Sequence, residues 1–153
     1  MNQFYNPIKI STKNARILVT GATGYIGGRL IPRLLSNGFK VRVLVRDKEK
    51  IRNKSWYKDV EVFEGDLTKP ESLMELPTGV DQAYYLIHSM SNSQDYMALD
   101  RLVAENFVAL FKNIKHVIYL GGISPEGHQI SEHLNSRIEV GKILSKNLPT
   151  TEF

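Results

Sequence analysis

Cysteine is absent from this chain of 153 residues. Without thiols the protein can form no disulfide, no thiolate metal site and no cysteine nucleophile. The four histidines, at positions 88, 116, 128 and 133, show no ligand spacing such as HExxH, so we expect no metal site. Because the lack of cysteine fits a reducing compartment, we expect a cytoplasmic location.

Long apolar runs are also lacking. No stretch approaches the ~18 apolar residues that a membrane-spanning helix needs, and we expect no membrane partner. Residues 1–14, MNQFYNPIKISTKN, lack the charged start and apolar middle of a signal peptide. We interpret them as a short polar lead-in to one domain over residues 15–153.

Charge of one sign is not concentrated anywhere, although the formal net charge is +4 and the isoelectric point is about 9.3. The densest basic segment, residues 46–54, also contains two acidic residues. Nucleic-acid binding usually needs clustered basic residues, so a solvated loop is the favoured interpretation and no nucleic-acid partner is expected. A third interpretation is that some of these charges meet a phosphorylated cofactor.

Short apolar runs alternate with helical patterns. The runs predict strands at 16–20, 40–46, 60–66, 81–90 and 116–123, and the helical patterns lie at about 25–36, 69–77, 93–113 and 130–147. Pro32 lies inside the first helical pattern and is expected to kink it or to lower its stability. Alternating strands and helices predict an α/β fold with a doubly wound parallel sheet, the Rossmann fold. Five strands are complete, and residues 148–153 look like the start of a sixth.

Four glycines fall within eight positions directly after the first strand. Gly21, Gly24 and Gly27 form a GxxGxxG pattern between a strand and a helix. Such a turn favours backbone angles that glycine adopts readily, lets a phosphate approach the main chain, and places it at a helix N-terminus. The pattern therefore predicts a pyrophosphate site. It is not a P-loop, since no GK[ST] follows. A glycine turn packed for purely structural reasons is the alternative.

The second strand ends at Arg46, 25 residues after Gly21. In a dinucleotide-binding fold this strand end faces the adenosine ribose, where an arginine suits a 2′-phosphate and an acid suits the free hydroxyl. Arg46 therefore favours NADP, whereas Asp47 would serve NAD if the strand ends one residue later. A solvated charge at a strand end is the structural alternative for Arg46.

The segments VTGATGYIGGRL, VRVLVRD, FEGDLTKPESL, DQAYYLIHSM and HVIYLGGI follow in order. Together they resemble the atypical and extended short-chain dehydrogenase/reductase superfamily, most closely its NmrA-like and NAD-dependent epimerase-like members. The resemblance covers about residues 15–153. It implies an NAD(P)-binding domain of an oxidoreductase or epimerase acting on an unknown small molecule. The alternative that it offers is a non-catalytic redox sensor of the NmrA-like kind.

The resemblance also implies roles for individual residues. Residues of the glycine turn would line the pyrophosphate: Thr23, Gly24, Tyr25 and Ile26. After the third strand, Asp66 and Leu67 would contact the adenine. At the end of the fourth strand, Leu86, Ile87 and His88 would lie along the nicotinamide ribose. Asp66 could instead be a turn or cap acid, and His88 a strand-end histidine without a partner.

The catalytic residues of the superfamily, a serine or threonine and a Tyr-x-x-x-Lys motif, are not found. Gly121 and Gly122 stand where the serine would be, with Ser124 a possible substitute. His133 and Arg137 occupy the tyrosine and lysine positions. A histidine can exchange protons near neutral pH, so the pair is a weak catalytic candidate beside the alternative of a surface histidine.

Full members of the superfamily continue beyond the sixth strand into a small substrate domain. The chain stops at LPTTEF, so the resemblance implies that the C-terminal substrate-binding part is lacking. An unfinished strand leaves an open sheet edge, which favours pairing with another copy. Either the chain is a fragment or another copy completes the sheet, and in the second case we expect a homo-oligomer.

Overall fold

The computed structural model describes residues 15–73, 79–89, 95–122 and 131–153, so the polar lead-in lies outside it. The elements are β1 (Arg16–Thr20), α1 (Tyr25–Ser36), β2 (Lys40–Val45), β3 (Glu61–Glu64), β4 (Gln82–Tyr85), α2 (Tyr96–Leu110), β5 (His116–Tyr119), α3 (Glu132–Asn147) and β6 (Thr150–Glu152). Short 3-10 turns lie at Lys48–Lys50, Tyr57–Asp59 and Pro70–Leu73. Strands and α-helices alternate as the apolar pattern predicts, except that, among the described residues, only 3-10 turns separate β2, β3 and β4.

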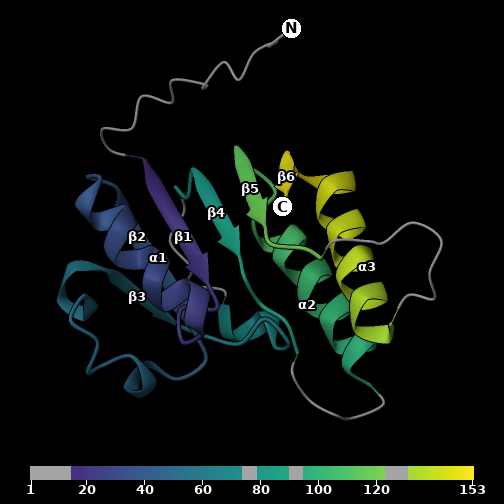
Figure 1. Cartoon of the computed structure of the whole chain (residues 1–153), viewed down its shortest axis with the longest axis horizontal. Helices are drawn as coiled ribbons and strands as arrows, with labels where there is room; N and C mark the ends of the chain where they lie inside the picture. The colour runs from purple at the N-terminus through teal and green to yellow at the C-terminus, as the bar shows by residue number, and fades with distance from the viewer. Residues whose placement is uncertain (1–14, 74–78, 90–94, 123–130) are drawn as a thin grey trace, which may run out of the picture.

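The six strands form one parallel sheet in the order β3-β2-β1-β4-β5-β6. This order confirms the predicted doubly wound Rossmann fold, including the sixth strand, which pairs with β5. The order of the strands reverses between β1 and β4, which is the switch point where such folds bind ligands. Because all pairs are parallel, the carboxyl ends of the strands lie at one edge of the sheet, as Figure 1 shows for β1, β4 and β5.

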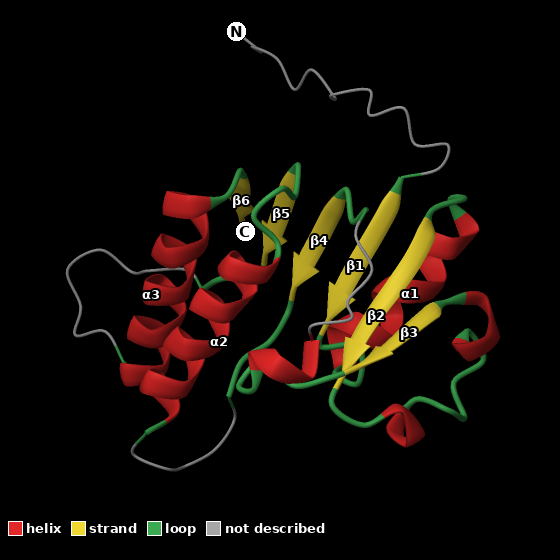
Figure 2. Cartoon of the chain, turned by 180° about the vertical axis from the view of Figure 1, so that it is seen from behind, coloured by secondary structure: helices red, strands yellow, loops and turns green. Residues whose placement is uncertain are grey.

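Helices cover both faces of the sheet. Figures 1 and 2 show α1 on one face and α2 beside α3 on the other. Alternate residues of β1 serve the two layers: Ile17 and Val19 pack with α1, whereas Leu18 packs on the α2 side. Burial on both faces explains why this strand is a continuous apolar run.

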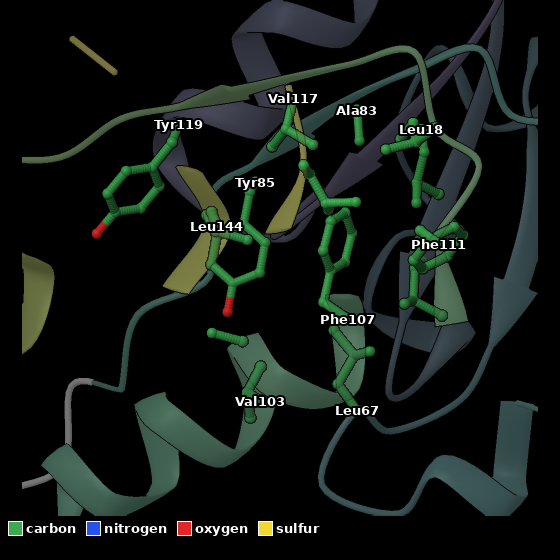
Figure 3. Close-up of a cluster of buried hydrophobic side chains, with 14 of the residues drawn as sticks. Leu18, Leu67, Ala83, Tyr85, Val103, Phe107, Phe111, Val117, Tyr119 and Leu144 are labelled. Carbon is green, nitrogen blue, oxygen red and sulfur yellow. The ribbon is translucent and has the colours of Figure 1, made fainter. Parts of the chain in front are cut away.

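Aromatic rings fill the layer between the sheet and α2 (Figure 3). Phe107 of α2 is fully buried, and its ring meets the Tyr85 ring edge-on with centroids 5.1 Å apart. Tyr119 of β5 packs against Tyr85 at 5.9 Å. Burying a side chain such as Phe107 contributes roughly 1.5–3 kcal/mol. These rings fix β4 and β5 against α2, directly beneath the site.

Strands β3, β4 and β5 are each shorter than the sequence predicts. The fourth apolar run extends to residue 90, yet β4 ends at Tyr85. The reason is a contact distant in sequence, because the Leu86 N–H donates to the Thr20 hydroxyl at 3.1 Å instead of to a strand partner. Residues 86–89 thereby leave the sheet and become free to form one wall of a cavity.

Pro32 lies within α1, which runs unbroken from Tyr25 to Ser36. A proline there removes one main-chain hydrogen bond, to the carbonyl of Gly28. The apolar face of the helix offsets this loss, since Ile31 and Leu34 are buried against the sheet. The helix ends at Asn37-Gly38, as predicted, with Gly38 at a φ of 82°.

The predicted helix at 69–77 is only a 3-10 turn over its described part, Pro70–Leu73. Across the described residues, none of the helices combines the length and the apolar character required to cross a bilayer.

Candidate functional site

A cavity of about 590 Å³ opens at the carboxyl ends of the strands, where the turns after β1, β2, β3 and β4 meet α2 and α3. Figure 2 shows the loops that gather at this edge of the sheet. Ten of the fourteen predicted site residues line it: Gly21, Thr23, Gly24, Arg46, Asp66, Leu67, Leu86, Ile87, His88 and Arg137. The other four are Tyr25, Ile26, Gly27 and His133.

The glycine turn after β1 is held tightly against β4. Gly21 has a φ of 72°, and a Cβ on it would lie 2.7 Å from the carbonyl oxygen of Leu86. The Gly24 N–H donates back to the Gly21 carbonyl at 3.0 Å. Glycine is therefore required at position 21 both by its backbone angle and by the close approach of the neighbouring segment.

The N-terminus of α1 faces this turn without a side chain to satisfy it. Gly24 is the N-cap and makes no side-chain hydrogen bond, and the first turn of α1 holds no acidic residue. The N–H groups of the first helical turn thus remain available, and the helix dipole adds positive potential there. Such an end is suited to a phosphate group.

Tyr25, Ile26 and Gly27 lie outside the cavity lining. Tyr25 is 73% exposed and its ring lies 4.3 Å below the Arg29 guanidinium. Ile26 is directed to a shallow groove on the α1 side of the sheet, which Leu86 also lines. Gly27 is buried under the turn. Periodicity alone cannot tell these directions apart, since they depend on the angle at which α1 leaves the turn.

Thr20, at the end of β1, is a site-forming residue that the sequence analysis missed. Its buried hydroxyl donates to the Tyr84 carbonyl at 3.1 Å and accepts from the Leu86 N–H at 3.1 Å. The Thr20 side chain therefore fixes the main chain at the end of β4 beside the glycine turn. The available signal was a threonine that ends an otherwise apolar run.

Replacing Thr20 by valine is expected to lower the free energy of unfolding by about 1–2 kcal/mol, because the isosteric side chain leaves two main-chain groups unsatisfied. Urea denaturation measures the change. The control is Thr150→Val, since the Thr150 hydroxyl bonds only the Leu148 carbonyl nearby, on the edge strand; its effect should stay within about 0.5 kcal/mol. Equal effects of the two substitutions would contradict the fastening role of Thr20.

Arg46 and Asp47, the two candidates at the end of β2, are used differently. Arg46 is exposed and lines the cavity. Asp47 caps the 3-10 turn that follows, where its carboxylate accepts the Glu49 N–H at 2.9 Å. The side chain that reaches the cavity at this strand end is thus a cation.

Asp66 forms a turn and lines the cavity at once. Its Oδ1 accepts from both the Thr68 N–H, at 2.9 Å, and the Thr68 hydroxyl, at 2.8 Å. The structural alternative considered for Asp66 is therefore present. The arrangement also fixes the carboxylate beside Leu67, which is buried and lines the same wall.

His88 follows β4 and lies opposite β5. Its Nε2 is 3.2 Å from the Leu120 carbonyl oxygen, so this nitrogen carries the proton. The buried Nδ1 has no hydrogen-bond partner among the described residues. Burial lowers the pKa of His88, and the Arg137 guanidinium lowers it further. Both effects favour the neutral imidazole, whose unprotonated nitrogen is then the buried Nδ1.

The two weak catalytic candidates on α3 are separated by the structure. Arg137 is half-buried and lines the cavity. His133 is exposed at the start of α3, where its ring stacks on Tyr96 of α2 with centroids 4.6 Å apart. His133 thus has a packing partner outside the cavity lining, and its catalytic role stays a prediction.

A serine at the first glycine after β5 would require a neighbouring side chain to move. A Cβ on Gly121 would collide with the Glu152 carboxylate, whose pKa is raised by partial burial. A Cβ on Gly122 would lie 2.5 Å from Leu134 Cδ1. Ser124 lies outside the described residues. No group of three or more metal-ligating side chains occurs within the described part of the chain.

Known proteins of related sequence are similar over much of the chain but are longer. Photosystem II assembly factor Ycf39 of Guillardia theta is 33% identical over 145 residues, which are 90% of this chain and 45% of that protein. Noscapine synthase SDR1 of Papaver somniferum is 30% identical over 95 residues, 57% of this chain and 27% of that enzyme. The chain spans at most about half of these relatives.

Solved structures share the fold. The triphenylmethane reductase of Citrobacter sp., complexed with NADP(H), is 28% identical with a TM-score of 0.73, over 89% of this chain and 48% of that one. WbmH of Bordetella bronchiseptica, solved with NAD+, is 17% identical with a TM-score of 0.68, over 91% of this chain and 55% of that one. The NmrA-like family model matches residues 13–144. With its sheet order and glycine turn, the chain belongs to the NmrA-like family and is a Rossmann domain of the atypical short-chain dehydrogenase/reductase, NAD(P)-binding type.

Proposed function

We propose that the chain binds NADP(H) in the cavity and forms the cofactor-binding part of an oxidoreductase or epimerase-like enzyme. The preference for NADP rests on the different positions of the two charged residues that follow β2. Arg46 faces the cavity, whereas the carboxylate that would recognise a free ribose hydroxyl is occupied in capping the next turn. An arginine suits the charge and geometry of a 2′-phosphate.

The described residues fit the remaining parts of the cofactor. The bare N-terminus of α1 would hold the pyrophosphate, and Asp66 with Leu67 would border the adenine. Leu86, Ile87 and His88 would lie along the nicotinamide ribose, with Arg137 opposite. When bound, the nicotinamide supplies the hydride, so the protein contributes binding and orientation. The reductase of Citrobacter sp., solved with NADP(H), supports this assignment.

A redox sensor without chemistry is the second candidate. It is favoured by the residues where the superfamily places its catalytic groups: two glycines lie shortly after β5, and His133 stacks on Tyr96 outside the cavity lining. A sensor needs only that the oxidised and reduced cofactors bind with different affinity, since a ligand shifts an equilibrium only through differential binding.

Titration of the chain with NADPH, NADP+, NADH and NAD+ tests the proposal. We expect NADPH to bind at least about tenfold more tightly than NADH, equivalent to ~1.4 kcal/mol. Absence of binding by all four would overturn the cofactor site. Incubation of the full-length protein with NADPH and a panel of carbonyl compounds then separates the candidates: oxidation of NADPH supports the enzyme, and tight but unproductive binding with a strong preference for one redox state supports the sensor.

The activity and the substrate of the whole protein remain proposals, because the chain spans only part of its relatives. A cytoplasmic location and self-association through the open edge of β6 also stay predictions. Analytical ultracentrifugation of the chain tests the second of these, with a concentration-dependent dimer as the expected result.

A further inference from the structure

Asp100 of α2 is a buried carboxylate that has no role in the cofactor site proposed above. It is 5% exposed. Its Oδ1 accepts the Ser89 N–H at 2.8 Å, and its Oδ2 accepts the hydroxyl of Ser136, itself 2% exposed, at 2.9 Å. No ion pair with Asp100 exists among the described residues. Burying a charge is costly unless it is hydrogen-bonded, so this carboxylate needs an explanation.

The two bonds join three separate segments, and each of them borders the cavity. Ser89 lies in the segment after β4, Asp100 lies between Leu99 and Val103 on α2, and Ser136 precedes Arg137 on α3. Four of these residues line the cavity: Ser89, Leu99, Val103 and Arg137. Asp100 itself does not line the cavity. Asp100 therefore lies behind the residues that line the cavity, on the side of His88 and Arg137, and connects their segments.

A second side chain of α2 holds the opposite wall. The Asn106 amide donates to the Leu67 carbonyl at 2.7 Å, in the segment after β3. Leu67 borders the end of the cavity near Asp66, whereas Ser89 borders the end near His88. One helix thus fixes two loops, six residues apart along its length, through side chain to main chain hydrogen bonds.

We infer that Asp100 is a positioning residue for the nicotinamide end of the cavity, and that Asn106 is its counterpart for the adenine end. The inference rests on the proposed cofactor site. Asp100 acts through geometry: it holds the Ser89 main chain, and with it Ile87 and His88, at a fixed distance from Arg137. The charge of the carboxylate is not required for this role, because two correctly placed hydrogen-bonding atoms suffice.

The experiment compares two ligands on each variant: NADPH, and adenosine 2′,5′-bisphosphate, which carries the adenine and the 2′-phosphate but no nicotinamide. Asp100→Leu is expected to weaken NADPH about tenfold, the loss of a hydrogen bond or two, and to leave the bisphosphate unchanged. Asn106→Ala is expected to weaken both ligands about fivefold, since both include adenine. A general loss of packing would instead weaken both ligands in both variants.

Asp100→Asn separates geometry from charge. Its amide oxygen can accept from Ser89 while its NH₂ donates to the Ser136 hydroxyl, so NADPH affinity should stay within about twofold of the wild type. Ser136→Ala removes one of the two bonds and keeps the other, so it should disturb folding less than Asp100→Leu and should weaken NADPH alone about threefold. It keeps the inference testable if Asp100→Leu does not fold.

The outcomes distinguish the inference from the proposed function. If the wild-type chain binds neither ligand, the cofactor site itself fails. If the wild type binds both and Asp100→Leu or Ser136→Ala binds NADPH normally, the positioning role is wrong while the cofactor site stands. A loss in Asp100→Asn as large as that in Asp100→Leu would also overturn the inference, because charge would then be the essential property.

Discussion

Gly27→Ala is expected to destabilise the chain by about 1–3 kcal/mol, the cost of overpacking a close contact, and to abolish cofactor binding. A Cβ at this position would overlap the Gly21 carbonyl oxygen and lie 3.0 Å from Ala22 Cα. Both obstacles are main chain in the glycine turn, which cannot rotate away as a side chain can. Relief requires that α1 moves off the turn, which displaces the helix N-terminus from the phosphate position.

Gly28→Ala is the matched control, one position further along the same helix. A Cβ there would find its nearest neighbour, the Ala22 carbonyl oxygen, at 3.9 Å, which is ordinary contact. Since alanine is the better helix former, this variant should gain about 0.5–1 kcal/mol. Thermal and urea unfolding measure both variants, and titration with NADPH measures binding. Equal stability of the two variants would show that α1 does not rest on the turn as described.

Arg46→Ala is expected to weaken NADPH by about 1.5–3 kcal/mol, the range for a hydrogen bond to a charged group, and to leave NADH nearly unchanged. Arg46 lines the cavity and is exposed, so its guanidinium can reach a 2′-phosphate and pair with its charge, whereas a free hydroxyl offers only a neutral hydrogen-bond acceptor. Because the contact is exposed, the NADPH affinity of the wild type should also fall as salt is raised.

Arg52→Ala is the control for charge alone. Arg52 lies in the same basic segment, but it pairs with Glu49 at 3.0 Å and does not line the cavity. Removing it changes the net charge equally. A similar loss of NADPH affinity in both variants would indicate general electrostatic attraction instead of recognition at Arg46, and a loss of NADH affinity in Arg46→Ala would argue against a 2′-phosphate contact.

The turn after β1 and the strands beside it followed from the sequence because their signals are local. A buried strand must be apolar throughout, and Gly21 must be glycine where φ is 72° and Leu86 lies against it. Strand ends were less predictable. The apolar run that contains β4 continues past Tyr85, but Thr20 diverts Leu86 out of the sheet. That hydrogen bond joins residues 66 positions apart, which no local pattern reports.

The candidate site shows the same division. The sequence favoured Arg46 over its neighbour Asp47 at the strand end but left both open, and the structure adds the capping bond from Asp47 to Glu49. His133 and Arg137 share a helix face by spacing, yet α2 approaches so that the Tyr96 ring meets the histidine while the arginine lines the cavity. The packing of one helix on another decides such a difference, not the period of either.

By itself the sequence determined the parallel sheet, the glycine turn after its first strand and the lack of thiol chemistry, since each depends on residue type and spacing over a few positions. Only the tertiary structure decided which charged groups face the cavity and that Asp100 lies behind its wall. The Asp100 bonds reach across 11 and 36 residues to Ser89 and Ser136. The physical reason is that the role of a buried polar group depends on its hydrogen-bond partners, and folding brings these together from distant parts of the chain.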